Sequence, residues 1–145
     1  MKVNEIAIGS DHAGFELKEA VKKHLEKINV AYKDYGPFSE DRVDYPDFAH
    51  PVAKAIENKE FELGILICGS GNGINMSANK HAGIRSALCW NKDIAEMARL
   101  HNDANILAMP GRYIDFDEAL KCVDVFLTTD FEGGRHTDRV HKISC

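Results

Sequence analysis

Residues 63–74 have the sequence LGILICGSGNGI, an apolar run that ends at Cys68 and passes directly into a loop with glycine at alternate positions. Short apolar runs bounded by turn residues are typical of buried strands. Leu63–Cys68 is therefore a predicted strand, and the same pattern predicts four more: Glu5–Gly9, Val30–Asp34, Gly83–Leu88 and Ala104–Met109. Helical stretches separate these runs. The alternation predicts an α/β fold in which helices cover both faces of a parallel sheet.

Apolar residues at helical spacing predict the covering helices. Leu17, Val21, Leu25 and Ile28 fall on one stripe of a helix, with lysine and glutamate on the opposite side. The spacing recurs over 52–56, 94–101 and 116–126, and the last segment begins with Asp115 and Glu118 at the spacing of a capping box. No repeat or flexible linker interrupts the 145 residues, so we expect one domain over 1–145.

The overall composition excludes several classes of function. A formal net charge of −5 argues against a broad basic surface for nucleic acid, and no apolar run approaches the ~20 residues that a membrane span needs. The four cysteines form no CxxC pair, which argues against a disulfide framework, and the amino-terminal stretch is too polar for a signal peptide. We expect a cytoplasmic protein without nucleic-acid or membrane partners.

The loop that follows Cys68 is suited to binding an anion. Gly69, Gly71 and Gly73 let the backbone approach a ligand and turn its N–H groups inward. The helix expected over Ile74–Lys80 adds the positive end of its dipole. The loop has neither the GxGxxG spacing of a dinucleotide site nor the lysine of a P-loop. It predicts a cradle for an oxyanion or a phosphate.

Reactive side chains follow the predicted strands, at the edge where open parallel sheets bind ligands. The N–H groups and the helix end should favour the thiolate of Cys68, a base or nucleophile, although a small buried hydrophobe is the alternative. Asp11 and His12 follow the first strand, and the alternative for Asp11 is to cap the next helix. His101 and Asn102 end a helix, where a histidine can also complement the dipole.

Basic residues gather near the carboxyl end, and two of them are arginines four residues apart. Arg135 and Arg139 suit a forked clamp on a phosphate, and they equally suit a solvated basic face. Gly133 and Gly134 precede them and favour the close approach of another group. The remaining histidines show no ligand spacing such as HExxH, so we expect no metal site.

Several motifs stand in order along the chain: GSDHAG (9–14), DYPDFA (44–49), ILICGSGNGI (65–74), ANK (78–80), HNDAN (101–105) and GGRHTDRV (133–140). Together they resemble the ribose-5-phosphate isomerase B family over nearly the whole chain. The resemblance implies a Rossmann-like three-layer sandwich with a five-stranded parallel sheet, assembled as a homodimer or a dimer of dimers. It also implies aldose–ketose isomerisation of a sugar phosphate, without a cofactor or metal.

The resemblance implies catalytic roles for four residues. Cys68 would be the base that moves a proton between C1 and C2 through an enediolate, assisted by Ser70 at the sugar hydroxyls. Some family members lack the cysteine and have a carboxylate where this chain has Ile74, so this chain belongs with the thiol branch. His101 and Asp11 would open the furanose ring. A cysteine base suits the reaction if its pKa lies near the working pH.

The same resemblance implies a substrate-binding set that surrounds the glycine loop: His12, Tyr45, Gly69, Gly71, Asn72, Gly73, Asn102, Arg112, Arg135 and Arg139. Asn102 and the loop backbone would hold the enediolate oxygens, and the arginines and His12 would hold the phosphate. Pro110 lies just before the loop of Arg112 and is able to shift it. Each site would combine residues of two subunits, with Cys68, Ser70 and Asp11 from one chain and His101 and Asn102 from its partner.

Other readings of the sequence stay open. Relatives within the family include allose-6-phosphate and galactose-6-phosphate isomerases, so the resemblance implies ribose 5-phosphate less firmly than the reaction itself. A non-catalytic module that binds a nucleotide or a sugar phosphate is the alternative from another class, although the intact catalytic set disfavours it. A cysteine phosphatase is disfavoured because the chain lacks the CxxxxxR loop.

Overall fold

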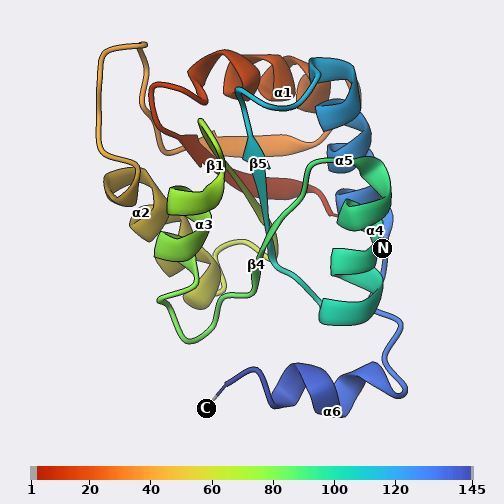
Figure 1. Ribbon diagram of the computed structural model, residues 1–145. Helices are drawn as coiled ribbons and strands as arrows, with labels where there is room; N and C mark the ends of the chain where they lie inside the picture. The colour runs from red at the N-terminus through yellow and green to blue at the C-terminus, as the bar shows by residue number, and fades with distance from the viewer. Residues whose placement is uncertain (1–2, 145) are drawn as a thin grey trace.

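The computed structural model describes residues 3–144, and a parallel sheet in the strand order β2-β1-β3-β5-β4 forms its centre (Figure 1). The strands are β1 (Glu5–Ser10), β2 (Ala31–Asp34), β3 (Gly64–Cys68), β4 (Ser86–Leu88) and β5 (Ile106–Pro110). Every neighbouring pair runs parallel. The predicted five-stranded parallel sheet is confirmed. Cys145 lies outside the described residues.

Helices cover both faces of the sheet. They are α1 (Phe15–Lys27), α2 (Pro46–Glu57), α3 (Asn72–Ala78), α4 (Lys92–Asn102), α5 (Phe116–Thr128) and α6 (His136–His141). One face packs against α1, α4 and α5, and the other against α2 and α3, which confirms the three-layer sandwich (Figure 1). Among residues 3–144, no helix combines the length and the apolarity needed to cross a bilayer.

Strand β3 contributes side chains to the two hydrophobic cores, one on each face of the sheet. Ile65 and Ile67 pack with the helices of the α1, α4 and α5 face, whereas Leu66 and Cys68 pack with α2 and α3. All the residues of β3 are buried, which explains its unbroken apolar run, since a strand covered on both faces does not alternate in polarity. The alternation directs the Cys68 side chain toward the side where α3 begins.

Some boundaries differ from the predictions. Strand β4 begins at Ser86 instead of Gly83, because the Gly83 N–H bonds to the Glu57 carboxylate and stays outside the ladder. Helix α3 occupies Asn72–Ala78 instead of 74–80. The predicted capping box of α5 is wrong. Asp115 makes no capping hydrogen bond, and Glu118 Oε2 instead accepts one from the Lys92 N–H at 2.7 Å, which joins α5 to the start of α4.

The sheet has its topological switch between β1 and β3. From β1 the chain builds β2 on one side, and it then crosses over to add β3 on the other side. Such a switch opens a crevice at the carboxyl ends of the two strands. The Asp11 N–H donates to the Ile67 carbonyl at 3.1 Å, so the loops that follow β1 and β3 begin side by side. Two of the predicted reactive segments therefore meet there.

A buried lysine anchors the loop between β2 and α2. Lys18 Nζ on α1 lies 2.7 and 2.9 Å from the two carboxylate oxygens of Asp34 and 2.6 Å from the Pro37 carbonyl oxygen. Burial alone would raise the pKa of Asp34, but hydrogen bonds from Lys18, Lys22 and the Gly36 N–H outweigh it and lower that pKa. The loop is thereby tied to the sheet at its first residues.

We expect Lys18→Met to lower the free energy of unfolding by about 3–5 kcal/mol, because it removes one partner of a buried ion pair and leaves Asp34 poorly compensated. Lys22→Met is the matched control. Its side chain is 19 % exposed and also pairs with Asp34, so we expect a loss of about 1 kcal/mol or less. Urea unfolding of both variants measures the difference. Equal losses would contradict the role given to Lys18.

Candidate active site

The glycine loop surrounds the Cys68 thiol with backbone N–H groups. The N–H groups of Ile74, Gly71 and Gly73 lie near enough to its sulfur to lower the pKa of the thiol. Gly71 has a φ of 78°, in the left-handed region, and a Cβ built there would lie 2.4 Å from Leu88 Cδ1. Only glycine fits this position without strain or displacement of its neighbours. The predicted cradle is thus present, with the thiol at its base.

Burial raises the pKa of the Cys68 thiol, whose residue is 4 % exposed. The N–H groups of the loop lower this pKa, and the negative charge of Asp11 raises it further. The net direction is opposite to the expectation that the loop and the helix end would favour the thiolate. The N–H groups lie where they were expected. In the chain without substrate, however, the removal of the sulfur from water raises the pKa by more than these groups lower it.

Asp11 and His12 lie beside the cradle and organise the loops around it. Asp11 Oδ1 accepts a hydrogen bond from the Gly14 N–H at 3.0 Å, which holds the turn just before α1, but no side chain caps the helix itself, so the capping role considered for Asp11 is wrong. Its carboxylate also influences the titration of Cys68, which places it at the same site. His12 Nδ1 lies 3.2 Å from both the backbone N and O atoms of Val43, which ties the loop before α2 to this edge of the sheet.

Three more of the predicted residues surround the glycine loop. The Tyr45 ring, just before α2, covers Gly73 so closely that a Cβ on this glycine would lie 2.5 Å from Tyr45 Cζ. Ser70 is exposed, and its Oγ accepts a hydrogen bond from the Asn72 N–H at 3.3 Å. Arg112 donates its backbone N–H to the Gly69 carbonyl at 3.0 Å, and its guanidinium lies beside Gly69. Arg112 therefore reaches the cradle despite the preceding proline.

The remaining predicted residues lie at the opposite end of the sheet. Helix α4 follows β4 at the carboxyl edge and leads back to the start of β5, so His101 and Asn102 in its last turn lie at the amino edge. Helix α6 packs beside this end of α4 and carries Arg139, with Arg135 just before it (Figure 1). One chain brings Asp11, His12, Tyr45, Arg112 and the Cys68 loop together, but it does not bring the α4 and α6 residues to them.

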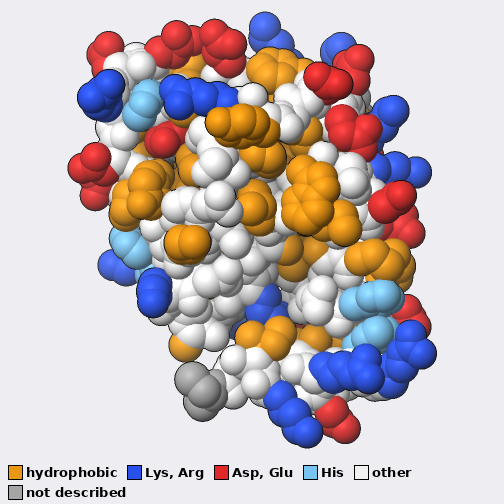
Figure 2. Space-filling view, viewed as in Figure 1, with side chains coloured by type: hydrophobic (Ala, Val, Ile, Leu, Met, Phe, Trp, Pro, Cys, Tyr) orange, Lys and Arg blue, Asp and Glu red, His pale blue; other side chains and the backbone are white. Residues whose placement is uncertain are grey.

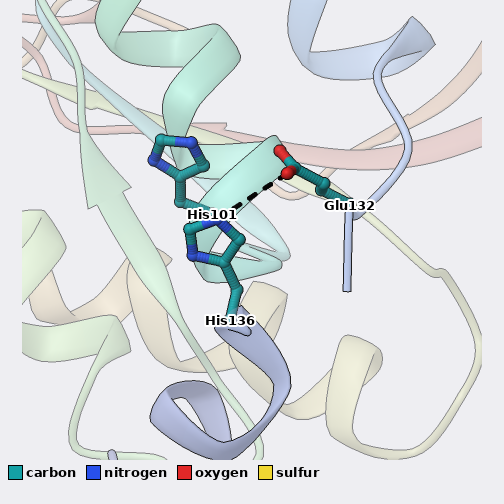
Figure 3. Close-up of side chains that lie close together, drawn as sticks. All are labelled: His101, Glu132 and His136. Atoms are coloured by element: carbon teal, nitrogen blue, oxygen red, sulfur yellow. Dashed lines mark ion pairs between the residues drawn. The ribbon is translucent and has the colours of Figure 1, made fainter. Parts of the chain in front are cut away.

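Beside His101, the structure places two residues that the sequence analysis did not assign to the site. The His136 ring stacks on the His101 ring, with centroids 4.3 Å apart, and Glu132 Oε1 lies 4.0 Å from His136 Nε2 (Figure 3). From sequence, His136 appeared only as part of a basic cluster, and Glu132 was not singled out. The spacing of four residues between Glu132 and His136 was a signal for this pair, but nothing in the sequence placed His101 against them.

Apolar side chains gather on the face seen in Figure 2, across the middle of the molecule. Among the large apolar residues exposed over the chain are Met76 on α3, Trp90 before α4 and Tyr113 after β5, at 65 %, 54 % and 75 % exposure. Exposed apolar surface is typical of interaction sites when it forms a contiguous patch.

The fold and the residues at its carboxyl edge define a class. This is a Rossmann-like α/β protein whose buried thiol, carboxylate and glycine cradle suit acid–base chemistry on a small anionic molecule.

Comparison with known proteins narrows the class. Residues 6–143 match the sequence profile of the family described as Ribose/Galactose Isomerase. The chain is 44 % identical over 142 residues to ribose-5-phosphate isomerase B of Escherichia coli K12, covering 98 % of this chain and 95 % of that protein. The ribose 5-phosphate isomerase of Thermotoga maritima is 50 % identical, with a TM-score of 0.96 and 99 % of each chain covered.

A third relative was solved with a ligand. Ribose-5-phosphate isomerase B of Mycoplasma genitalium, with bound ribulose 5-phosphate, is 44 % identical and has a TM-score of 0.90, covering 96 % of this chain and 93 % of that one. The chain belongs to the ribose/galactose isomerase family. The resemblance inferred from its motifs is confirmed.

Proposed function

We propose that this protein interconverts ribose 5-phosphate and ribulose 5-phosphate by proton transfer through an enediolate. The observation that carries the proposal is the position of Cys68, a buried thiol within a ring of backbone N–H groups at the switch point of the sheet. The relatives named ribose-5-phosphate isomerase B, one of them with bound ribulose 5-phosphate, support ribose over a hexose as the sugar.

In this proposal each group at the cradle has a role. Deprotonated Cys68 removes the proton from C2 of the open-chain aldose and returns it to C1, while a proton shifts from O2 to O1. The N–H groups of the glycine loop stabilise the negative charge on the oxygens, and such donors contribute about 3 kcal/mol each. Ser70 on the glycine loop acts at the sugar hydroxyls, and Asp11, which follows β1, opens the furanose ring together with His101. The raised pKa of Cys68 makes its thiolate a stronger base toward a carbon acid.

A complete site requires a second chain. The predicted site residues on α4 and on or near α6 lie at the opposite end of the sheet from Cys68. These residues, His101, Asn102, Arg135 and Arg139, can therefore take part only in the site of a partner subunit. In a two-fold dimer the same patch meets itself, which lets two complete sites form at once. The exposed apolar face is suited to be buried in such a contact. We therefore infer a homodimer, which can pair further into a dimer of dimers.

The described cysteines Cys68, Cys89 and Cys122 are free and buried. Free thiols of this kind persist in a reducing compartment, which supports a cytoplasmic location.

The test is an assay with three substrates. The purified protein is incubated separately with ribose 5-phosphate, allose 6-phosphate and galactose 6-phosphate, and ketose formation is followed in each. We expect the highest kcat/KM with ribose 5-phosphate. A preference for either hexose phosphate would make the chain a hexose-6-phosphate isomerase, and binding without turnover of any of the three would favour the non-catalytic module.

We expect Arg139→Ala to lower kcat/KM for the phosphorylated sugar by about 10- to 100-fold, because a charge-assisted hydrogen bond contributes about 1.5–3 kcal/mol. Turnover of free ribose, which has no phosphate, should be unchanged. Lys121→Ala on α5 is the control, since it removes an exposed cation away from the α4 and α6 residues. Equal losses with the phosphorylated and the free sugar would mean that Arg139 supports the fold instead of the anion.

A further inference from the structure

Two imidazoles and a carboxylate converge at the amino edge of the sheet, on the side away from the glycine loop. His101 comes from the last turn of α4, Glu132 from the segment before α6, and His136 from the first turn of α6 (Figure 3). One potential ligand atom from each side chain lies within 4.8 Å of the other two. The segments are distant in sequence, so only the packing of α6 against α4 creates the cluster.

His136 contributes a buried nitrogen that has no hydrogen-bond partner in the described part of the chain. The residue is 5 % exposed, and its Nε2 atom makes no hydrogen bond. Glu132 Oε1 lies at 4.0 Å from this nitrogen, which is beyond hydrogen-bond distance. Buried polar atoms are nearly always paired, so a nitrogen of this kind calls for a group that the protein itself does not supply.

The unpaired nitrogen of His136 is of a type that coordinates metal ions. Imidazole binds a metal through a ring nitrogen whose lone pair is not engaged elsewhere, and Nε2 of His136 makes no hydrogen bond to the described residues.

We propose that His101, Glu132 and His136 form a binding site for a divalent transition-metal ion, with Zn²⁺ as its best match. Two histidine nitrogens and one glutamate oxygen, completed by water, are a ligand set that zinc takes in tetrahedral geometry. Calcium and magnesium prefer oxygen ligands and fit this set poorly.

Binding requires small movements of two side chains. Zinc holds its nitrogen and oxygen ligands at about 2.0–2.2 Å, so the three ligand atoms have to approach one another. The Glu132 side chain is 52 % exposed and is free to swing toward the rings. The two rings lie nearly parallel, at 15°, so the His101 ring has to turn until its lone pair faces the ion.

The surrounding charge limits the affinity. Arg135 and Arg139 lie close enough to His136 to lower its pKa, and the same positive charge opposes a cation. We therefore expect weaker binding than at a structural zinc site, together with reversible exchange.

A bound ion would inhibit the enzyme. This part of the inference rests on the proposed function, in which His101 opens the sugar ring. A metal ion on His101 occupies the lone pair that accepts the proton. Zinc should therefore lower isomerase activity, and a chelator should leave the activity of the metal-free protein unchanged.

Binding is tested by titrating chelator-treated protein with Zn²⁺ alone in a calorimeter. We expect one ion per chain for the unmodified protein, and affinity at least about tenfold weaker in Glu132→Gln and in His136→Asn. Two controls should bind as the unmodified protein does. His81→Ala removes a histidine of a different histidine–glutamate pair, and Cys68→Ala removes the thiol of the cradle. Unchanged affinity in Glu132→Gln, or loss of binding in Cys68→Ala, would overturn the site.

Activity gives a second and separate measurement. Glu132→Gln without metal should retain full activity, since Glu132 takes no part in the proposed reaction, and its inhibition constant for Zn²⁺ should rise by the same factor as its dissociation constant. A chain that binds zinc at this site but isomerises no sugar phosphate would refute the proposed function and leave the metal site standing. Loss of activity with EDTA that zinc restores would contradict the inhibitory role.

Discussion

Cys68→Ala should lower kcat for ribose 5-phosphate by about 100- to 10,000-fold, the usual contribution of a positioned acid–base group. The substrate dissociation constant should change little, because the thiolate acts in the transition state whereas the phosphate-binding residues act in both states. Steady-state kinetics and calorimetric binding of the substrate measure the two quantities.

The pH dependence of the unmodified protein supplies an independent measurement. Because burial raises the pKa of Cys68, the thiolate fraction increases as the pH rises toward that pKa. We expect kcat/KM to climb with pH on the alkaline side of neutrality, and the residual activity of Cys68→Ala to lack this limb. Cys89→Ala is the control, because Cys89 is also buried, with a pKa of about 12, but belongs to the core on the other face. Near-normal turnover in Cys68→Ala would contradict the assignment.

Inactive Cys68→Ala and His101→Ala proteins should recover about a quarter of normal activity when they are unfolded and refolded together. Random pairing makes about half of the dimers mixed, and in a shared-site dimer each mixed dimer has one site with both defects and one with none. The recovery follows from the placement of Cys68 and His101 at opposite ends of the sheet in one chain. Activity after refolding, with dimer exchange verified by mass, measures it.

A second mixture controls for the geometry. Cys68→Ala and Asp11→Ala lie at the same cradle, so in their mixed dimers each of the two sites carries one defect, and no activity should return. If the Cys68→Ala and His101→Ala mixture exchanges subunits and still stays inactive, His101 serves its own chain and the shared-site model is wrong.

Much of the fold was predictable because its signals are local. The unbroken apolar run of β3 and the helical spacing in α1 each depend on burial by nearby elements, and both elements formed where expected. The capping box of α5 failed because Glu118 found a better partner in the Lys92 N–H, which comes from another element.

The sequence predicted which residues are candidates for the site better than it predicted how those residues lie relative to one another. The strand-end rule placed Asp11 and Cys68 together, since both follow neighbouring parallel strands. The direction of the Cys68 pKa shift was not predictable from the loop, because it depends on how completely distant segments exclude water. The stacking of His136 on His101 arises because α6 packs against α4. No local sequence pattern predicts that packing.

The path of α4 from one edge of the sheet to the other makes this helix a spacer of fixed length. Its first turn is held to α5 by Glu118, and its last turn carries His101. Inserting a single residue in α4 would advance His101 by about 1.5 Å and rotate it by about 100° around the helix axis. The proposed role of His101 in a neighbouring subunit's site depends on its direction, so such a rotation would abolish that role. We therefore expect the helix to accept changes of residue type on its exposed side but no change in length.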